Sequence, residues 1–392
     1  QKGEINVKKI ISIALALLMV AVMLPVMAMA DENTAVAKLT VGTTVTYHDT
    51  LADAVNAAID KTDAKIDVLK SSNGDGIEVK HPKKLDLTID FHGYTYDVSG
   101  KAVGSKGYES QAWHIEKESK LTLMNGTLEA SSKSVAMLFQ NYSNLTLKNM
   151  VLNTQKTDFA YVMSNNNGNV MIEDTTIFAA DGRVAFDVCR YTDYVGPKVT
   201  VKGNSVINGK VEISSSGAKD GAQHELVIEN GTFNGPIVKD GDSPNFSSSI
   251  SGGTFNSDVT EYVGENTLVV TDGNNYYVGE DAKKAVENAT SGTFTVVRAV
   301  PGEGVEFENV KPGVTVKNGM NDGKVTVNGN EVKPGATYTV PGAPIIIYNP
   351  TVDTPKANDQ KNPGTGANDF VGVAAAMAVV SLLGAAAVIR KK

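Results

Sequence analysis

The sequence predicts a mainly β protein whose centre is a stack of similar coils, with a short helical cap before the stack and a small β-rich unit after it. The leading observation is an eight-residue pattern that recurs with copies starting 24, 25, 29, 27 and 22 residues apart. Apolar residues occupy mostly its first, third and eighth places, and such alternation turns side chains to one face of a strand. The six copies begin at Leu121, Leu145, Val170, Val199, Leu226 and Ser248.

The fifth place of each copy indicates a sharp bend. It holds Asn, Asp or Gly, the residues that tolerate a left-handed backbone most readily. β-Branched residues are frequent on both sides of this place, and they favour strands over helices. Each copy is therefore expected to form a strand, a bend and a second strand.

The long period of the pattern predicts coils that stack in parallel, because each strand then pairs with its own copy in the next coil. This organisation resembles the right-handed parallel β-helix, the pectate-lyase-like architecture. The resemblance covers residues 85–265, where an irregular first turn starts near Leu87. A β-sandwich of antiparallel hairpins is the competing interpretation, although hairpins usually recur at shorter spacing.

The segment before the coils is expected to close their first end. Residues 47–59 have the pattern of an amphipathic helix, and residues 66–69 that of a strand. An open β-helix end exposes unpaired backbone groups and apolar interior, so it needs a cap. We therefore expect segment 31–84 to be an N-terminal cap.

A second helix-then-strand segment follows the coils. Residues 281–289 are expected to be helical and residues 294–297 extended, at the start of a C-terminal α+β unit that spans residues 266–349. Pro-Gly and Asn-Gly turns separate its later strands, which are expected at residues 314–316, 325–327 and 345–347. Residues 350–361 are polar and contain proline, which is typical of a spacer.

The first thirty residues have the three-part organisation of a secretory signal peptide. Lys8 and Lys9 precede an apolar run over residues 10–23, and the small residues Ala28 and Ala30 lie directly before the acidic Asp31. Basic, apolar and small-residue parts in this order predict export, with cleavage between Ala30 and Asp31. The alternative is a transmembrane anchor.

The other end of the chain has a second targeting pattern. An apolar run over residues 370–389 is long enough to cross a bilayer and is followed by the basic residues Arg390, Lys391 and Lys392. A pentapeptide precedes this run and consists of Asn362, Pro363, Gly364, Thr365 and Gly366.

Together these parts, residues 362–392, resemble the cell-wall sorting signal of sortase substrates. The resemblance implies cleavage between Thr365 and Gly366, transient membrane insertion, and covalent attachment of Thr365 to the peptidoglycan of a Gram-positive bacterium. The commonest motif of the family opens with Leu, whereas this one opens with Asn362, which leaves the sortase class open. A permanent transmembrane helix is the alternative.

Charge and cysteine content narrow the classes of function. The chain has a net charge of −8, and removal of two ends that each carry +2 leaves −12 between Asp31 and Thr365. This balance argues against nucleic acid as a partner, because nucleic-acid binding needs basic patches. The single Cys189 excludes an intramolecular disulfide and is expected to be a small buried hydrophobe.

Signatures of catalysis are weak. β-Helix hydrolases commonly carry an adjacent Asp pair and Gly-His-Gly, and neither occurs here. The only arginines within the coils, Arg183 and Arg190, are expected in exposed loops. The five His have no metal-ligand spacing, so no cofactor is expected. Calcium has two short candidate sites, residues 240–242 and 321–323, where ordinary turns are the favoured interpretation.

Three classes of function remain open. The first is an adhesin or glycan-binding protein without catalysis, the second a surface polysaccharide lyase or glycoside hydrolase, and the third a structural spacer. Sugar sites commonly use aromatic side chains as platforms. The candidate glycan contacts are Tyr94, Trp113, Tyr161, Tyr191 and Tyr194.

Overall fold

The structure is a computed structural model. It describes residues 31–154, 159–192, 196–217, 223–241 and 245–342. The expected signal peptide, the strand at residues 345–347, the spacer and the sorting signal lie outside the described residues, and so does Tyr194.

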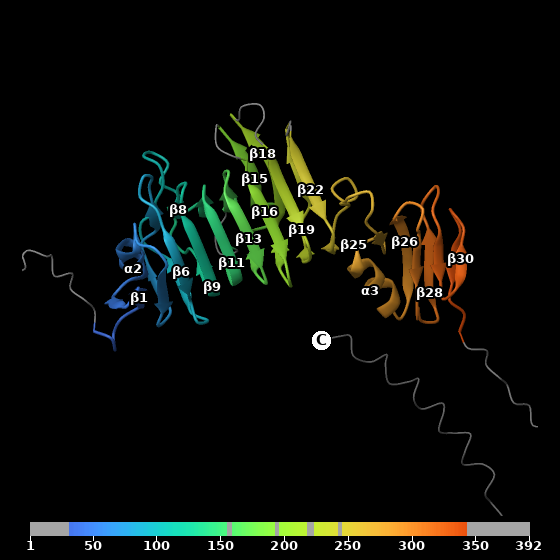
Figure 1. Cartoon of the computed structure of the whole chain (residues 1–392), viewed down its shortest axis with the longest axis horizontal. Coiled ribbons are helices and arrows are strands. Elements are labelled where there is room, and N and C mark those ends of the chain that lie inside the picture. Colours follow the sequence, from blue (N-terminus) through green and yellow to red (C-terminus); the bar gives the residue numbers. More distant parts are fainter. Residues whose placement is uncertain (1–30, 155–158, 193–195, 218–222, 242–244, 343–392) are drawn as a thin grey trace, which may run out of the picture. The chain divides into compact units, whose positions relative to one another are not determined.

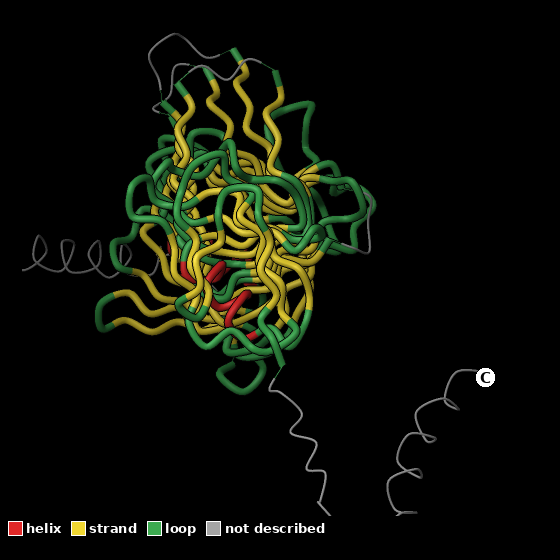
Figure 2. The backbone as a smooth tube through the Cα atoms, turned by 90° about the vertical axis from the view of Figure 1, so that its right-hand side faces the viewer, coloured by secondary structure: helices red, strands yellow, loops and turns green. Residues whose placement is uncertain are grey.

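The chain is mainly β, and its strands form a parallel solenoid of about ten turns (Figure 1). In a view at right angles to the first, the successive coils lie over one another (Figure 2). The pairing of equivalent strands is parallel from coil to coil. This confirms the predicted stack of parallel coils and excludes the sandwich of antiparallel hairpins.

Each complete coil has three faces, and the first two belong to one large sheet. The first face contains β3 (Ala64–Val68), β6 (Asp86–Asp90), the first halves of β9 (Lys120–Glu129) and β11 (Asn144–Asn153), β13 (Asn169–Glu173), β16 (Lys198–Lys202), β19 (His224–Ile228) and β22 (Phe246–Ile250). The second face contains β4 (Ser72–Gly74), β7 (Thr95–Val98), the second halves of β9 and β11, β14 (Thr176–Phe178), β17 (Val206–Asn208), β20 (Thr232–Phe233) and β23 (Gly253–Phe255).

The third face is a separate parallel sheet. It contains β5 (Ile77–Val79), β8 (Gln111–Ile115), β10 (Met137–Asn141), β12 (Tyr161–Asn165), β15 (Val184–Tyr191), β18 (Lys210–Ser216) and β21 (Ile237–Asp240).

The core consists of apolar rows that run from coil to coil. On the first face Leu123 pairs with Leu147, Leu147 with Ile172, and Ile172 with Val201. All four side chains are fully buried. Like residues thus stack on like residues, as the repeated pattern predicts, and burial of each such side chain contributes roughly 1.5–3 kcal/mol.

The copy that begins at Val199 departs from the expected alignment. Its eighth place is Val206, but Ile177, the eighth place of the preceding copy, pairs with Ile207 instead. Ile207 is also the residue that is fully buried. Val206 pairs with Thr176 instead and is half-buried. The bend before β17 therefore contains one residue more than the bend before β14. After this bend β17 pairs with β14 in a regular register.

The N-terminal cap contains more strand than expected. β1 (Ala37–Val41) pairs antiparallel with β2 (Thr44–His48) and with β3. The helix α2 (Leu51–Ala58) is shorter than the expected range 47–59, because its N-cap is Thr50, whose hydroxyl accepts a hydrogen bond from Asp53 N–H. Parallel pairing already starts at β3, so the stack begins inside segment 31–84.

The C-terminal unit resumes the solenoid after an antiparallel interruption. β24 (Val269–Thr271) and β25 (Tyr276–Val278) pair antiparallel and precede α3 (Glu280–Asn288). Parallel pairing then joins β26 (Gly292–Arg298) to β28 (Val314–Asn318) and β27 (Val305–Phe307) to β29 (Val325–Val327). Antiparallel partners cover the last coil, namely β30 (Asn330–Val332) and β31 (Thr337–Thr339).

The core row can be tested with two neighbouring residues that point to opposite faces of β13. Ile172 is fully buried, whereas Met171 is 37% exposed. We predict that Ile172→Ala lowers the free energy of unfolding by about 2–5 kcal/mol, because it leaves a cavity between two coils. Met171→Ala should change it by less than about 1 kcal/mol. Chemical denaturation of both variants measures the difference, and equal losses would contradict the assignment of the two faces.

Candidate functional site

The bends between the first and second faces have the left-handed backbone that the sequence predicts. Asn125, Asn149 and Asp174 have φ values of 59°, 51° and 48°, and Gly203 has φ 67°. These residues occupy the fifth place of four successive copies. The strain of a positive φ is small for Asn and Gly. In the copies that begin at Leu226 and Ser248 the positive φ lies one place later than predicted, at Gly231 (134°) and Gly253 (110°).

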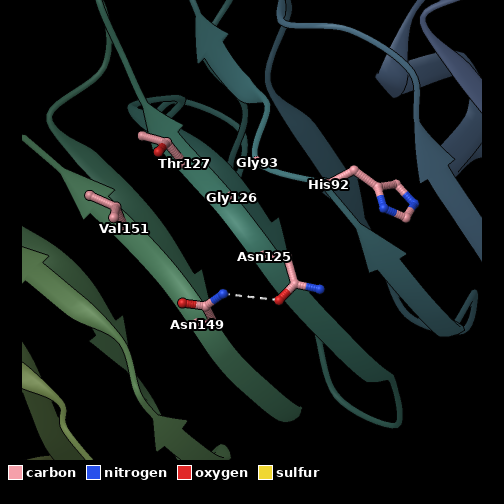
Figure 3. A pocket seen from close by; sticks show the side chains of 7 residues that line it. All are labelled: His92, Gly93, Asn125, Gly126, Thr127, Asn149 and Val151. Atoms are coloured by element: carbon pink, nitrogen blue, oxygen red, sulfur yellow. Dashed lines mark hydrogen bonds between the residues drawn. The ribbon is translucent and has the colours of Figure 1, made fainter.

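The side chains at these bends form a ladder of hydrogen bonds. Asn149 Nδ2 donates to Asn125 Oδ1 at 3.1 Å, as Figure 3 shows. Asn125 Nδ2 donates to Asp90 Oδ1 at 3.1 Å, and the backbone N–H of His92 donates to the same oxygen at 3.0 Å. The ladder therefore links three successive coils along the axis of the stack.

A compensated charge cluster lies at the N-terminal end of the ladder. Asp67 lies 3.0 Å from His92 Nε2, 2.9 Å from Lys65 Nζ and 3.1 Å from Lys38 Nζ. Burial alone would raise the pKa of Asp67, but hydrogen bonds from Lys65, His92 and Lys38 outweigh it and hold this pKa well below its usual range. Asp67 is thus a carboxylate whose charge is already matched by cations of the protein.

A shallow hollow of about 440 Å³ opens beside the ladder. We call it the bend groove and define it by the residues that line it (Figure 3), which are His92, Gly93, Asn125, Gly126, Thr127, Asn149 and Val151. This lining contains amides, a hydroxyl, an imidazole and a methyl surface, but no Asp, Glu, Lys or Arg. Its chemistry suits a neutral ligand rich in hydroxyl groups.

Gly126 is required by the close packing beneath the groove. A Cβ at this position would lie 2.1 Å from Cβ of Phe91 and 2.6 Å from the carbonyl oxygen of Tyr94. Phe91 is fully buried, so it has no room to give way. The missing side chain lets two neighbouring coils approach each other and leaves the groove open above them.

A row of small β-branched side chains continues from the groove along the second face. Neighbours in the row are paired in register from β7 to β23. All are half-buried or exposed, so the row faces solvent. We call it the threonine-valine row, and it consists of Thr95, Thr127, Val151, Thr176, Val206, Thr232 and Thr254.

Two of the predicted glycan contacts have opposite outcomes. Tyr94 is 38% exposed and adjoins the groove, where its carbonyl oxygen accepts a hydrogen bond from Thr127 N–H at 3.1 Å. Trp113 is fully buried, and its ring stacks on Phe139 at 5.7 Å with an interplanar angle of 12°. The prediction for Trp113 is therefore wrong, because β8 is buried along its whole length and this ring belongs to the hydrophobic core.

Tyr161 and Tyr191 lie on the third face, at opposite ends of its strands. The Tyr161 hydroxyl donates to Glu212 Oε1 at 2.7 Å. The Tyr191 ring contacts Tyr142 edge-on at 6.2 Å. Both are half-buried. The described aromatic candidates thus do not form one platform.

The third face contains a carboxylate pair that the sequence did not reveal. Asp187 on β15 pairs in register with Glu212 on β18. The pKa of Asp187 is raised to about 7. Burial is the largest cause and the charge of Glu212 adds to it, whereas hydrogen bonds from Asn165 N–H and Ser164 Oγ act in the opposite direction. Glu212 itself lies 2.8 Å from Lys210 Nζ. The two carboxylates are only 3% and 5% exposed.

This pair was missed because its members are 25 residues apart and belong to strands outside the repeated pattern. The only available signal was an acidic residue between apolar neighbours in each strand, Asp187 between Phe186 and Val188 and Glu212 between Val211 and Ile213. Recognition of the pair needed the strand register.

Two neighbouring residues of β15, Cys189 and Arg190, were the subject of predictions, and the structure bears out only the one for Cys189. Arg190 is 2% exposed within a strand, so the expectation of an exposed loop residue is wrong for it. Cys189 is 5% exposed, and burial raises the pKa of its thiol to about 12, as expected for a small buried hydrophobe.

Within the described ranges, no three His, Cys, Asp or Glu side chains are grouped so that they could hold a metal ion.

No family model, curated protein or solved structure matches this chain. In the part of the chain that the structure describes, no helix has the length and apolar character needed to cross a membrane.

The raised pKa of Asp187 predicts a pH dependence of stability. Between about pH 4 and 7 the folded chain holds a proton on Asp187 that the unfolded chain releases, so the free energy of unfolding falls as pH rises through this window. We predict that Asp187→Asn removes this contribution. Denaturation midpoints at pH 4.5 and 7.5 should therefore show the variant gaining stability relative to wild type at the higher pH. Asp322→Asn, at an exposed position, is the control. A pH-independent difference for Asp187→Asn would refute the assignment.

Proposed function

We propose that this protein binds an uncharged glycan through the bend groove and does not cleave it. The observation that carries the proposal is the lining of the groove, which offers amide, hydroxyl and imidazole groups and contains no Asp, Glu, Lys or Arg. Sugars present both hydrogen-bond donors and acceptors at every ring, and such a lining can serve both. Tyr94, which is 38% exposed and follows Gly93 of the lining in the chain, is the aromatic candidate for a sugar contact here.

The ladder leaves hydrogen-bonding capacity for a ligand. Each Asn amide nitrogen has two N–H groups, and the ladder uses one of them on Asn149 and one on Asn125. These amides are already ordered by their neighbours in the stack. Binding therefore immobilises few side chains, which lowers its entropic cost.

A second candidate is a polysaccharide hydrolase or lyase that uses Asp187 and Glu212. Glycoside hydrolysis needs two carboxyl groups, one of them able to hold a proton, and the raised pKa of Asp187 suits that role. Against this, both side chains are almost fully buried, and each is engaged by hydrogen bonds or an ion pair within the protein. Binding therefore ranks above catalysis. A structural spacer without a ligand is the third candidate.

We further propose that the protein works outside the cell, attached to the wall of a Gram-positive bacterium. The support comes from the sequence alone, namely the signal-peptide pattern over residues 1–30 and the order of pentapeptide, apolar run and basic tail in residues 362–392. Its partners would then be a sortase and peptidoglycan, with a polysaccharide or a host glycan as ligand.

Binding without turnover can be measured on a glycan array together with an assay for released sugar. We predict that the purified chain retains at least one neutral glycan and releases neither reducing nor unsaturated sugar from it. Sugar release that Asp187→Asn abolishes would instead establish the hydrolase or lyase. An array without any bound glycan would favour the spacer.

The anchoring proposal is tested by deletion of Asn362–Gly366. We predict that the deletion moves the protein from the cell-wall fraction to the membrane fraction or the medium, because the transpeptidase then has no peptide bond to cut. A five-residue deletion within residues 350–361 is the control and should leave the protein in the wall. Persistence of the first variant in the wall would show that attachment does not depend on this motif.

A further inference from the structure

We propose that the ligand is an extended, neutral, β-linked polysaccharide that lies along the stack, with about one sugar for each coil. This inference rests on the proposed glycan-binding function and adds the class and the direction of the polymer. It follows from the regular spacing of the groups that surround the bend groove.

The first argument is the spacing. Thr95, Thr127 and Val151 are paired in register on three successive coils, and the ladder repeats from Asp90 through Asn125 to Asn149 over the same coils. Neighbouring coils are separated by about 4.8 Å. An extended chain of β-linked pyranose rings advances by a similar length at each sugar. Each ring of such a polymer therefore lies at one coil, beside one member of the ladder and one member of the threonine-valine row.

The second argument is the charge. Two carboxylates beside the ladder are engaged within the protein, since Asp67 contacts Lys38, Lys65 and His92, and Asp90 accepts two hydrogen bonds. An acidic polysaccharide would meet no Lys or Arg in the lining, and a basic one no carboxylate. A neutral polymer has no charged groups that would lose their hydration in the groove without gaining an ion-pair partner.

The third argument is the surface beyond the groove. The threonine-valine row continues past Val151 to Thr176 and the coils that follow. Its Val and Thr side chains are half-buried or exposed and carry methyl groups, and the Thr side chains add hydroxyls. Pyranose rings likewise have an apolar face with a polar edge. The row therefore extends the contact that begins in the groove, so longer chains gain more contacts than short ones.

The chain contains a matched control for the ladder. Asn234 Nδ2 donates to Asn208 Oδ1 at 2.8 Å, so the same amide chemistry links two coils at the opposite corner of the second face. Neither residue lines the bend groove. A variant at Asn234 therefore tests whether any amide ladder suffices or whether this groove is the site.

The experiment is titration calorimetry on the full chain. The probes are β-1,4-linked oligomers of glucose, N-acetylglucosamine and mannose with two to eight sugars, and galacturonate oligomers of the same lengths. We expect a neutral series to bind with an affinity that rises about tenfold or more between two and six sugars. Galacturonate oligomers of equal length should bind at least about tenfold more weakly.

The variants are Asn149→Gly, which keeps a residue suited to the left-handed bend, Thr127→Val, which keeps the side-chain shape, and Asn234→Ala. The first two should weaken binding of the six-sugar oligomer by about fivefold to tenfold each, and the third should leave it within about twofold. Thermal melting checks that each variant is folded.

The titration separates the inference about the polymer from the proposal that the protein binds glycans. Affinity that does not depend on length, preference for galacturonate, or an equal effect of Asn234→Ala overturns the inference while glycan binding stands. Absence of binding to every probe overturns the inference as well, and the glycan array then decides whether the proposed function falls with it.

Discussion

The in-register stacking of apolar side chains between successive coils is the interaction on which the rest of the structure depends. On the first face every coil from β6 to β19 places two apolar residues at equivalent positions, and those positions pair across the large sheet. Side chains alternate along a strand, so a slip by one residue would turn the buried row outward and the solvent-facing row inward. The hydrophobic effect therefore selects one register, and the backbone hydrogen bonds between coils follow it.

The bends protect that register because they tolerate differences in coil length. Asn125, Asn149, Asp174 and Gly203 turn the chain at the same corner through a left-handed backbone. The coil that contains Gly203 has an additional residue before Ile207, yet its strands on both sides of the bend remain paired. In this coil the additional residue thus stays at the corner, where Asp174 accepts a hydrogen bond from Asn204 N–H.

The same register that builds the core also arranges the outer surface. Residues that face solvent are repeated at the coil spacing as strictly as those inside, because both follow from one pairing of strands. The threonine-valine row, the amide ladder and the pair of Asp187 and Glu212 all arise in this way. Their environments differ, however. The ladder borders an open groove, whereas the carboxylates of the third face are buried and bonded to the protein.

The sequence by itself determined the parallel coils, the place of the bends and the two short helices, because these depend on local alternation and on backbone preferences of single residues. It also placed Cys189 in the interior. Only the tertiary structure decided what lies side by side. Trp113 and Arg190 are buried within the third-face strands, which lie outside the repeated pattern, so nothing in the local sequence showed that they would be covered. The groove and the carboxylate pair each join residues from different coils, and their geometry exists only once the register between those coils is set.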